Sequence, residues 1–180
     1  MKPTSLLLIF ASMSIGGCKA QPVRHINSSS YATNAQPVDG SQLEYVLFGV
    51  FCGECSGHCA TMYRYNTIGH SFTLWVDTTD SYFTNKDSVH CKTPVTNAQK
   101  MALADSIVQQ IPDDFLTTIK SKETFGCPDC TDGCGIYLEL GEAGGRKQFY
   151  IDYQTEKLPQ QVRTFAESFK RQLFRIQSIK

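Results

Sequence analysis

The sequence predicts an α+β domain in which two similar β-hairpin units form one antiparallel sheet and helices pack on one face of it. Three observations predict this fold class. A Cys-x2-Cys-x3-Cys motif occurs twice, once from Cys52 to Cys59 and once from Cys127 to Cys134. Each copy is followed by residues that alternate in polarity, which is typical of half-buried strands. Apolar residues at helical spacing come later in each unit, and such a stripe needs a surface to cover.

The first hairpin unit is expected to begin at Leu43. The apolar stretch from Leu43 to Phe51 predicts a strand that leads into the first cysteine motif. Residues 61–65 and 72–76 alternate in polarity on either side of the turn-like sequence Asn66-Thr67-Ile68-Gly69. They therefore predict a hairpin with one buried face.

A polar connection, residues 81–96, separates this hairpin from two predicted helices. Thr96 or Asn97 can cap the first helix, in which apolar residues recur at helical spacing. These residues are Met101, Ala104, Val108 and Ile111. Pro112 ends that helix, and the acidic pair Asp113-Asp114 suits the first turn of a second, short helix.

The second hairpin unit follows the same plan. Residues 136–140 alternate in polarity, and residues 149–151 do so after the turn-like sequence Ala143-Gly144-Gly145. A closing helix then has an apolar stripe made of Val162, Phe165, Phe169, Leu173 and Ile176.

Aligning the two cysteine motifs extends the repeat without a gap. Trp75 then falls on Tyr150, and Asp77 falls on Asp152. Carboxylates at the ends of strands usually cap backbone amides in turns, so we expect that role for both aspartates rather than calcium binding.

Length and charge fit one globular domain with short appendages. The chain has 180 residues and a formal net charge of zero at pH 7, so it has no basic excess to attract nucleic acid. We expect one domain at residues 43–180, with an internal repeat whose halves are about 43–121 and 122–180.

Residues 1–17 have the features of an export signal. Lys2 supplies a positive charge, residues 6–10 form an apolar run too short to span a bilayer, and the segment closes with Ile15-Gly16-Gly17-Cys18. This ending resembles the lipobox of bacterial lipoproteins. The resemblance implies cleavage before Cys18, a diacylglycerol on its sulfur and usually a further acyl chain, such as palmitate, on its new amino group.

Residues 18–42 are expected to be the lipidated cysteine and a flexible tether, because Ser, Asn, Gln, Pro and Gly dominate them without an apolar period. Lipid of this size gives a stable membrane anchor. The leader therefore implies a place in the bacterial cell envelope, at the outer membrane, on its periplasmic or surface face.

The cysteines are the main candidate site residues. The chain has eight, and lipidation of Cys18 leaves an odd number, so at least one is free or pairs between molecules. The candidates for disulfides or for metal ligands are Cys52, Cys55, Cys59, Cys91, Cys127, Cys130 and Cys134. An oxidising compartment favours disulfides. We expect one link inside or between the Cys-x2-Cys pairs of each unit, and one link from Cys59 to Cys91.

Two other roles for the cysteines stay open. Two Cys-x2-Cys pairs on separate hairpins can place four thiolates around Zn²⁺, and soft thiolates also accept Cu(I). Three histidines can extend such a site, namely His58, His70 and His90. A thiol–disulfide oxidoreductase is less favoured, because strand-like sequence follows both pairs and no helix N-terminus is there to lower a thiol pKa.

No motif for acyl transfer, nucleotide chemistry or zinc peptidase activity is present. We therefore expect a non-enzymatic, disulfide-stabilised binding or scaffold domain that needs no cofactor, with a thiolate metal-binding lipoprotein as the alternative. Trp75 and Tyr150 are expected to point outward from paired strands, so they are a candidate binding surface for an envelope protein or a glycan.

Beyond the leader, the domain resembles small cysteine-containing domains of uncharacterised bacterial lipoproteins. The resemblance is carried by Cys52, Gly53, Cys55, Cys127, Asp129 and Cys130. It implies an envelope location and an α+β fold, and it assigns no activity.

Overall fold

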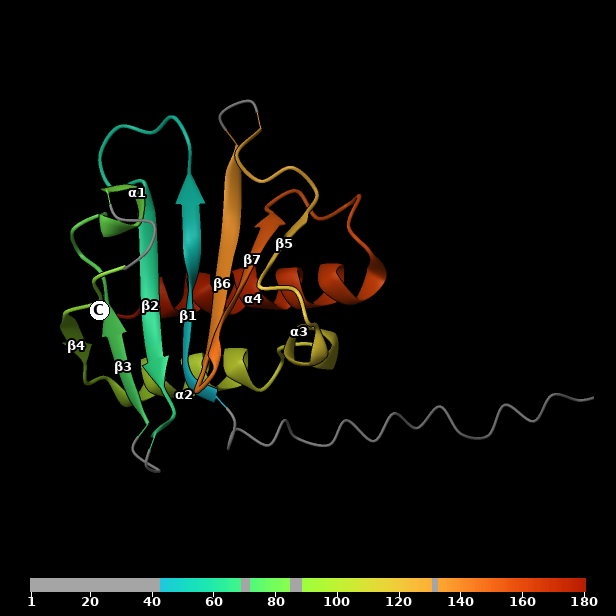
Figure 1. Ribbon diagram of the computed structural model, residues 1–180. Coiled ribbons are helices and arrows are strands. Elements are labelled where there is room, and N and C mark those ends of the chain that lie inside the picture. The colour runs from blue at the N-terminus through green and yellow to red at the C-terminus, as the bar shows by residue number, and fades with distance from the viewer. Residues whose placement is uncertain (1–42, 69–71, 85–88, 131–132) are drawn as a thin grey trace, which may run out of the picture. The chain divides into compact units, whose positions relative to one another are not determined.

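The computed structural model describes residues 43–68, 72–84, 89–130 and 133–180 (Figure 1). The expected signal peptide, the lipidation site Cys18 and the tether lie outside these residues, as does His70. None of the helices in the described part of the chain is both long and apolar enough to cross a bilayer.

The described residues form one seven-stranded sheet with the strand order β4-β3-β2-β1-β6-β7-β5. The strands are β1 (Leu43–Cys52), β2 (Ala60–Asn66), β3 (Thr73–Val76), β4 (Thr93–Val95), β5 (Lys122–Phe125), β6 (Cys134–Glu142) and β7 (Gly145–Asp152). The α+β class predicted from the sequence is therefore confirmed.

The sheet is mixed, which corrects the prediction of a purely antiparallel one. Five neighbouring pairs are antiparallel, but the edge strand β5 runs parallel to β7. The chain reverses direction from β5 to β6 and again from β6 to β7, and β7 then lies between the other two strands. Strands β5 and β7 must consequently run in the same direction.

Strand β1 lies at the centre of the sheet, with the hairpin β2–β3 on one side and the hairpin β6–β7 on the other. In register, Phe48 of β1 lies opposite Tyr63 of β2 and Leu138 of β6. Both predicted hairpins are present. The two strands that precede the cysteine motifs differ in their position in the sheet, because β1 is central and β5 is at an edge. The duplication itself stays a prediction.

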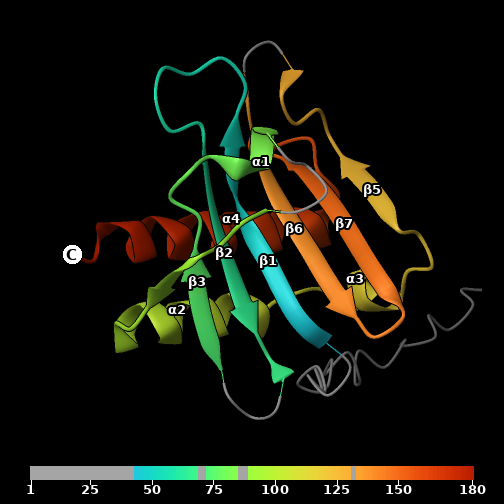
Figure 2. The same ribbon diagram turned by 60° about the vertical axis from the view of Figure 1, so that its left-hand side comes forward.

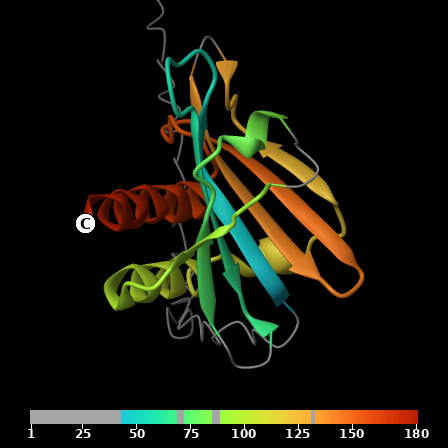
Figure 3. The ribbon, with the colours of Figure 1, turned by 90° about the vertical axis from the view of Figure 1, so that its left-hand side faces the viewer.

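Three helices pack on one face of the sheet, as predicted: α2 (Ala98–Val108), α3 (Asp113–Thr117) and α4 (Gln160–Ser178). A fourth, the single turn α1 (Ser81–Thr84), lies on the opposite face, where the sequence had indicated only a polar connection (Figure 3). Asn97 caps α2, since its side-chain oxygen accepts hydrogen bonds from the backbone N–H groups of Gln99 and Lys100.

The main core lies between the sheet and these three helices. Alternate residues of the strands face it, and the predicted stripe of α4 covers them. Fully buried members are Val46, Phe48, Leu138, Leu140, Phe149, Ile151, Phe169 and Ile176. Burial of each such side chain contributes about 1.5–3 kcal/mol, so this layer provides much of the fold's stability.

Candidate binding site

Three disulfides lie at one end of the sheet, one between the last residue of β1 and the first residue of β6 and two in the adjoining loops. Cys52 pairs with Cys134 and joins the two central strands, with 82 residues of sequence separation. The other two close very short loops, since Cys55 pairs with Cys59 and Cys127 pairs with Cys130. The domain is therefore disulfide-stabilised.

The expected link between Cys59 and Cys91 is wrong. Cys59 pairs with Cys55 inside its own loop, and Cys91 is the one cysteine in the described residues outside a disulfide. Cys91 is half-buried beside β2, where its Sγ lies 3.6 Å from the carbonyl oxygen of Met62. Cys59 instead lies in the loop before β2.

The four thiolates of the metal hypothesis are not gathered in this structure, because the sulfurs of both Cys-x2-Cys pairs are in disulfides. Within the described ranges, no group of three or more His, Cys, Asp or Glu side chains is placed to hold a metal ion. His58 lies beside Asp80 rather than at a sulfur cluster, with its Nδ1 at 3.6 Å from Asp80 Oδ2.

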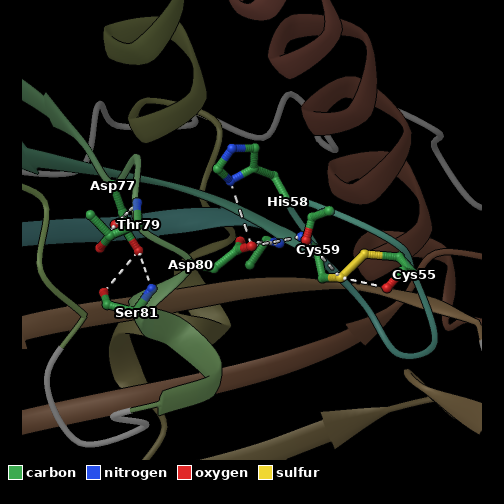
Figure 4. Close-up of polar contacts among 9 residues, drawn as sticks. Cys55, His58, Cys59, Asp77, Thr79, Asp80 and Ser81 are labelled. Carbon is green, nitrogen blue, oxygen red and sulfur yellow. Dashed lines mark hydrogen bonds and ion pairs between the residues drawn. A yellow bond between two sulfur atoms is a disulfide. The ribbon is translucent and has the colours of Figure 1, made fainter.

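Two aspartates organise the loop after β3, and one of them, Asp80, ties this loop to the end of the first cysteine loop (Figure 4). Asp80 accepts hydrogen bonds from the backbone N–H groups of Cys59 and Ala60, at 3.1 and 2.8 Å. Asp77 accepts them from the backbone and hydroxyl groups of both Thr79 and Ser81, at 2.7–2.8 Å. Burial raises the pKa of Asp77, but these hydrogen bonds outweigh that effect and hold the pKa below its ordinary value.

The expectation that Asp77 and Asp152 cap backbone amides is confirmed. Asp152 accepts hydrogen bonds from the backbone N–H groups of Cys127 and Gln154, at 2.9 and 2.8 Å. Asp77 directly follows β3 and Asp152 is the last residue of β7, so each aspartate fixes the loop at the end of its strand.

The face of the sheet opposite α2, α3 and α4 is called the outer face below. It has a small second core of apolar and aromatic side chains. Its members are Leu47, Phe51, Ala60, Met62, Tyr82 and Tyr137. Tyr82 of α1 stacks on Phe51, with ring centres 4.9 Å apart, so α1 covers only the end of this face near the disulfides.

A polar network, here called the Glu139 network, crosses the middle of the outer face. Glu139 is 4% exposed and accepts hydrogen bonds from the hydroxyls of Tyr45 and Tyr137 at 2.7 and 2.6 Å and from Nε2 of Gln148 at 3.0 Å. Arg146 Nη1 lies 3.6 Å from the same carboxylate. Burial first, and then the bond to Glu139, raises the pKa of Tyr45 to about 12, so this phenol stays a donor at neutral pH.

A shallow groove of about 480 Å³ lies beside this network and is called the Trp75 groove below. Arg64 of β2 and Trp75 of β3 are direct neighbours across the two strands. His90 and Lys92 come from the connection between α1 and β4, which crosses the outer face in front of β2 and β3 (Figure 2). The groove thus brings the cations Arg64 and Lys92, together with the imidazole of His90, next to an indole ring.

A larger hollow of about 590 Å³ lies between α3, β5 and the start of α4. Its charged groups are of both signs and pair locally, because Lys120 Nζ donates to Glu123 Oε1 at 2.8 Å. The Trp75 groove is smaller but has charges of one sign next to an aromatic surface, so we consider it the better candidate site.

The predicted platform of Trp75 and Tyr150 does not form. The two residues lie on the same face, but β2, β1 and β6 separate their strands. Tyr150 packs edge-on against Phe51 and Tyr137, and Lys122 Nζ lies 4.7 Å from its ring centre. Of these two residues, only Trp75 lines the Trp75 groove.

Sequence reasoning missed the polar partners of Trp75. A signal for Arg64 was present, because a hairpin closed by the turn after Asn66 places Arg64 opposite Trp75. For His90 and Lys92 the sequence offered no signal, since their connection reads as polar and has no period that shows which face it crosses.

No protein family matches the chain, and comparisons with curated proteins and with solved structures gave no match either.

Proposed function

We propose that this chain is a lipid-anchored domain of the bacterial cell envelope, and that it binds another envelope component on its outer face without catalysing a reaction. The observation that carries the proposal is the set of three disulfides. Disulfides persist in oxidising compartments and are rare in the cytosol, so they support a protein that is exported. The lipobox-like sequence that ends at Cys18 supports the anchor.

The state of the reactive groups supports binding rather than catalysis. The buried carboxylates Asp77 and Glu139 are engaged in hydrogen bonds within the domain. Burial raises the pKa of the Cys91 thiol to about 12, so the thiol stays protonated and is a poor nucleophile at neutral pH. In the Trp75 groove, by contrast, the exposed Lys92 and the half-buried Arg64 line a hollow that a ligand can enter.

The disulfide part of the proposal is tested by intact mass of the full lipoprotein, under native and denaturing conditions, before and after alkylation. We expect a mass lower by two hydrogens for each of the three disulfides, and one alkylatable thiol, Cys91, after unfolding. A native mass that includes a metal ion, with four or more thiols alkylated only after chelation, would replace this proposal with the thiolate metal site.

The anchor is tested by cell fractionation of a Cys18→Ala variant. We expect the wild-type chain in the membrane fraction and the variant in the soluble fraction, because the variant has no sulfur to carry the diacylglycerol. Continued membrane association of the variant would contradict the lipid anchor.

A further inference from the structure

We propose that the Trp75 groove binds a sugar ring that bears a carboxylate, as part of an acidic polysaccharide. This inference rests on the proposed function, because it names the ligand class of the same outer face. Three features carry it: the fixed position of one guanidinium, the sign of the surrounding charge and the half-buried indole ring that lines the groove.

Arg64 is held in place by two neighbours. Its Nε donates to Oδ1 of Asn66 at 2.9 Å, and its guanidinium carbon lies 3.7 Å from the centre of the Tyr45 ring. Asn66 is fixed in turn, because its Nδ2 donates to Oγ1 of Thr73 at 3.1 Å. Among the residues that the structure describes, no carboxylate pairs with Arg64. Its terminal Nη groups are therefore ready to form the two parallel hydrogen bonds that a carboxylate accepts.

The charge around Arg64 favours an anion. His90 and Lys92 also line the groove and are exposed, whereas no Asp or Glu is among its lining residues in the described part of the chain. The buried carboxylate on this face, Glu139, lies in its own network with Tyr45 and Arg146. A ligand carboxylate in the groove thus meets the positive charge of Arg64 and Lys92, and none of the described lining residues is acidic.

The indole ring of Trp75 indicates which class of anionic ligand fits the groove. Its half-buried indole gives the groove a flat apolar surface directly beside the Arg64 guanidinium. A phosphate ion uses the cations and leaves the indole uncovered, and an acidic peptide side chain has no flat ring to lay on it. A uronic acid ring has an apolar face of C–H groups and a carboxylate at its edge, so it satisfies both parts of the groove together.

The experiment uses fluorescence, because Trp75 is the sole tryptophan of the chain and reports directly on the groove. The full lipoprotein in neutral detergent micelles is titrated with tetragalacturonic acid, and in parallel with its methyl ester, which keeps the rings and removes the charges. We expect a saturable change in Trp75 emission with the acid, binding at least about tenfold weaker with the ester, and weaker binding of the acid as salt is raised.

Variants test whether the acid binds in the Trp75 groove or elsewhere on the outer face. Arg64→Gln and Lys92→Gln are each expected to weaken binding of the acid by about tenfold, and Arg64→Lys should weaken it as well, because it keeps the charge but loses the planar fork. Lys122→Gln is the matched control, since Lys122 is a cation on the same face that lies at Tyr150 instead of the groove. It should bind like wild type. Far-UV circular dichroism and thiol alkylation confirm that each variant is folded and oxidised.

The other outcomes overturn the inference. Equal affinity for tetragalacturonic acid and its ester would mean that the ligand only stacks on the indole. Equal affinity for tetraglutamate and tetragalacturonic acid would mean an acidic peptide site. Competition by millimolar inorganic phosphate would mean a simple anion site. No emission change with tetragalacturonic acid also overturns it. The disulfide and lipid-anchor parts of the proposed function would still stand in each case, because they depend on the mass and fractionation results and not on this titration.

Discussion

At the level of single residues, Tyr45 connects the Trp75 groove with the Glu139 network. Its ring supports the Arg64 guanidinium, and its hydroxyl donates to Glu139 at 2.7 Å. The ring can lie there because the residue opposite it on β6 is Gly141. A Cβ on that glycine would lie only 2.1 Å from the nearest atom of the Tyr45 ring.

The first prediction concerns this close approach. Gly141→Ala should displace the Tyr45 ring, disturb the bond to Glu139 and lower the free energy of unfolding by about 1–3 kcal/mol. Gly144→Ala is the control, since a Cβ there meets nothing within 4 Å. Urea denaturation of both variants measures the difference. Equal stability of the two would show that the ring moves aside at no cost.

The second prediction concerns Asp77 and pH. Its pKa is lowered in the folded state. Its carboxylate therefore stabilises the fold above the unfolded pKa of about 4, and that stabilisation is lost as pH falls through the folded pKa. Asp77→Asn should be less stable than wild type by about 1–3 kcal/mol at pH 7, and the gap should narrow towards pH 2.

Urea denaturation at several pH values checks this, with Glu156→Gln as the control for loss of an exposed carboxylate. The control should follow the wild-type pH dependence. A gap between wild type and Asp77→Asn that is constant from pH 7 to pH 2 would contradict the role given to the carboxylate.

At the level of elements, helix α4 covers the centre of the sheet. Its apolar stripe faces the strands, and Phe169 packs edge-on against Phe48 of β1 with ring centres 5.9 Å apart. The same helix exposes Phe174, which is 71% accessible to solvent. One helix thus offers a buried and an exposed phenylalanine for a matched comparison.

The third prediction uses this pair. Phe169→Ala should lower the free energy of unfolding by about 3–5 kcal/mol, because it removes a fully buried ring and leaves a cavity. Phe174→Ala should change it by no more than about 0.5 kcal/mol. Thermal and urea denaturation give both values, and a large loss in Phe174→Ala would show that this exposed ring is covered in solution.

At the level of the whole molecule, the three disulfides differ in how much of the chain they constrain. The link from Cys52 to Cys134 joins residues 82 positions apart, whereas Cys55 and Cys59 are only four apart. In the chain-entropy argument, a disulfide stabilises a fold by restricting the unfolded chain, and this effect grows with loop length.

The fourth prediction follows from that difference. Replacing both Cys52 and Cys134 by serine should lower the free energy of unfolding by about 4–5 kcal/mol, and replacing both Cys55 and Cys59 by only about 2 kcal/mol. Denaturation of the two double variants measures the order. The reverse order would mean that the short loop stabilises the native state itself, beyond its effect on the unfolded chain.

The sequence by itself determined the local elements of this protein. The alternation in residues 61–65 and 136–140 predicted strands, and the stripe of α4 predicted the helix that covers them, although β6 is buried on both faces rather than one. These predictions succeed because the period of apolar residues depends on the geometry of one element alone. The capping of the Thr79 backbone by Asp77 is equally local, because the two residues are two positions apart.

Only the tertiary structure decided which distant residues meet. It placed β5 parallel to β7, paired Cys52 with Cys134 in place of a partner in its own motif, and left Cys91 unpaired. It also laid the connection with His90 and Lys92 beside Arg64 and Trp75. Such contacts depend on strand order and on the packing of the whole sheet, and a periodic pattern has no information about which element will lie next to it.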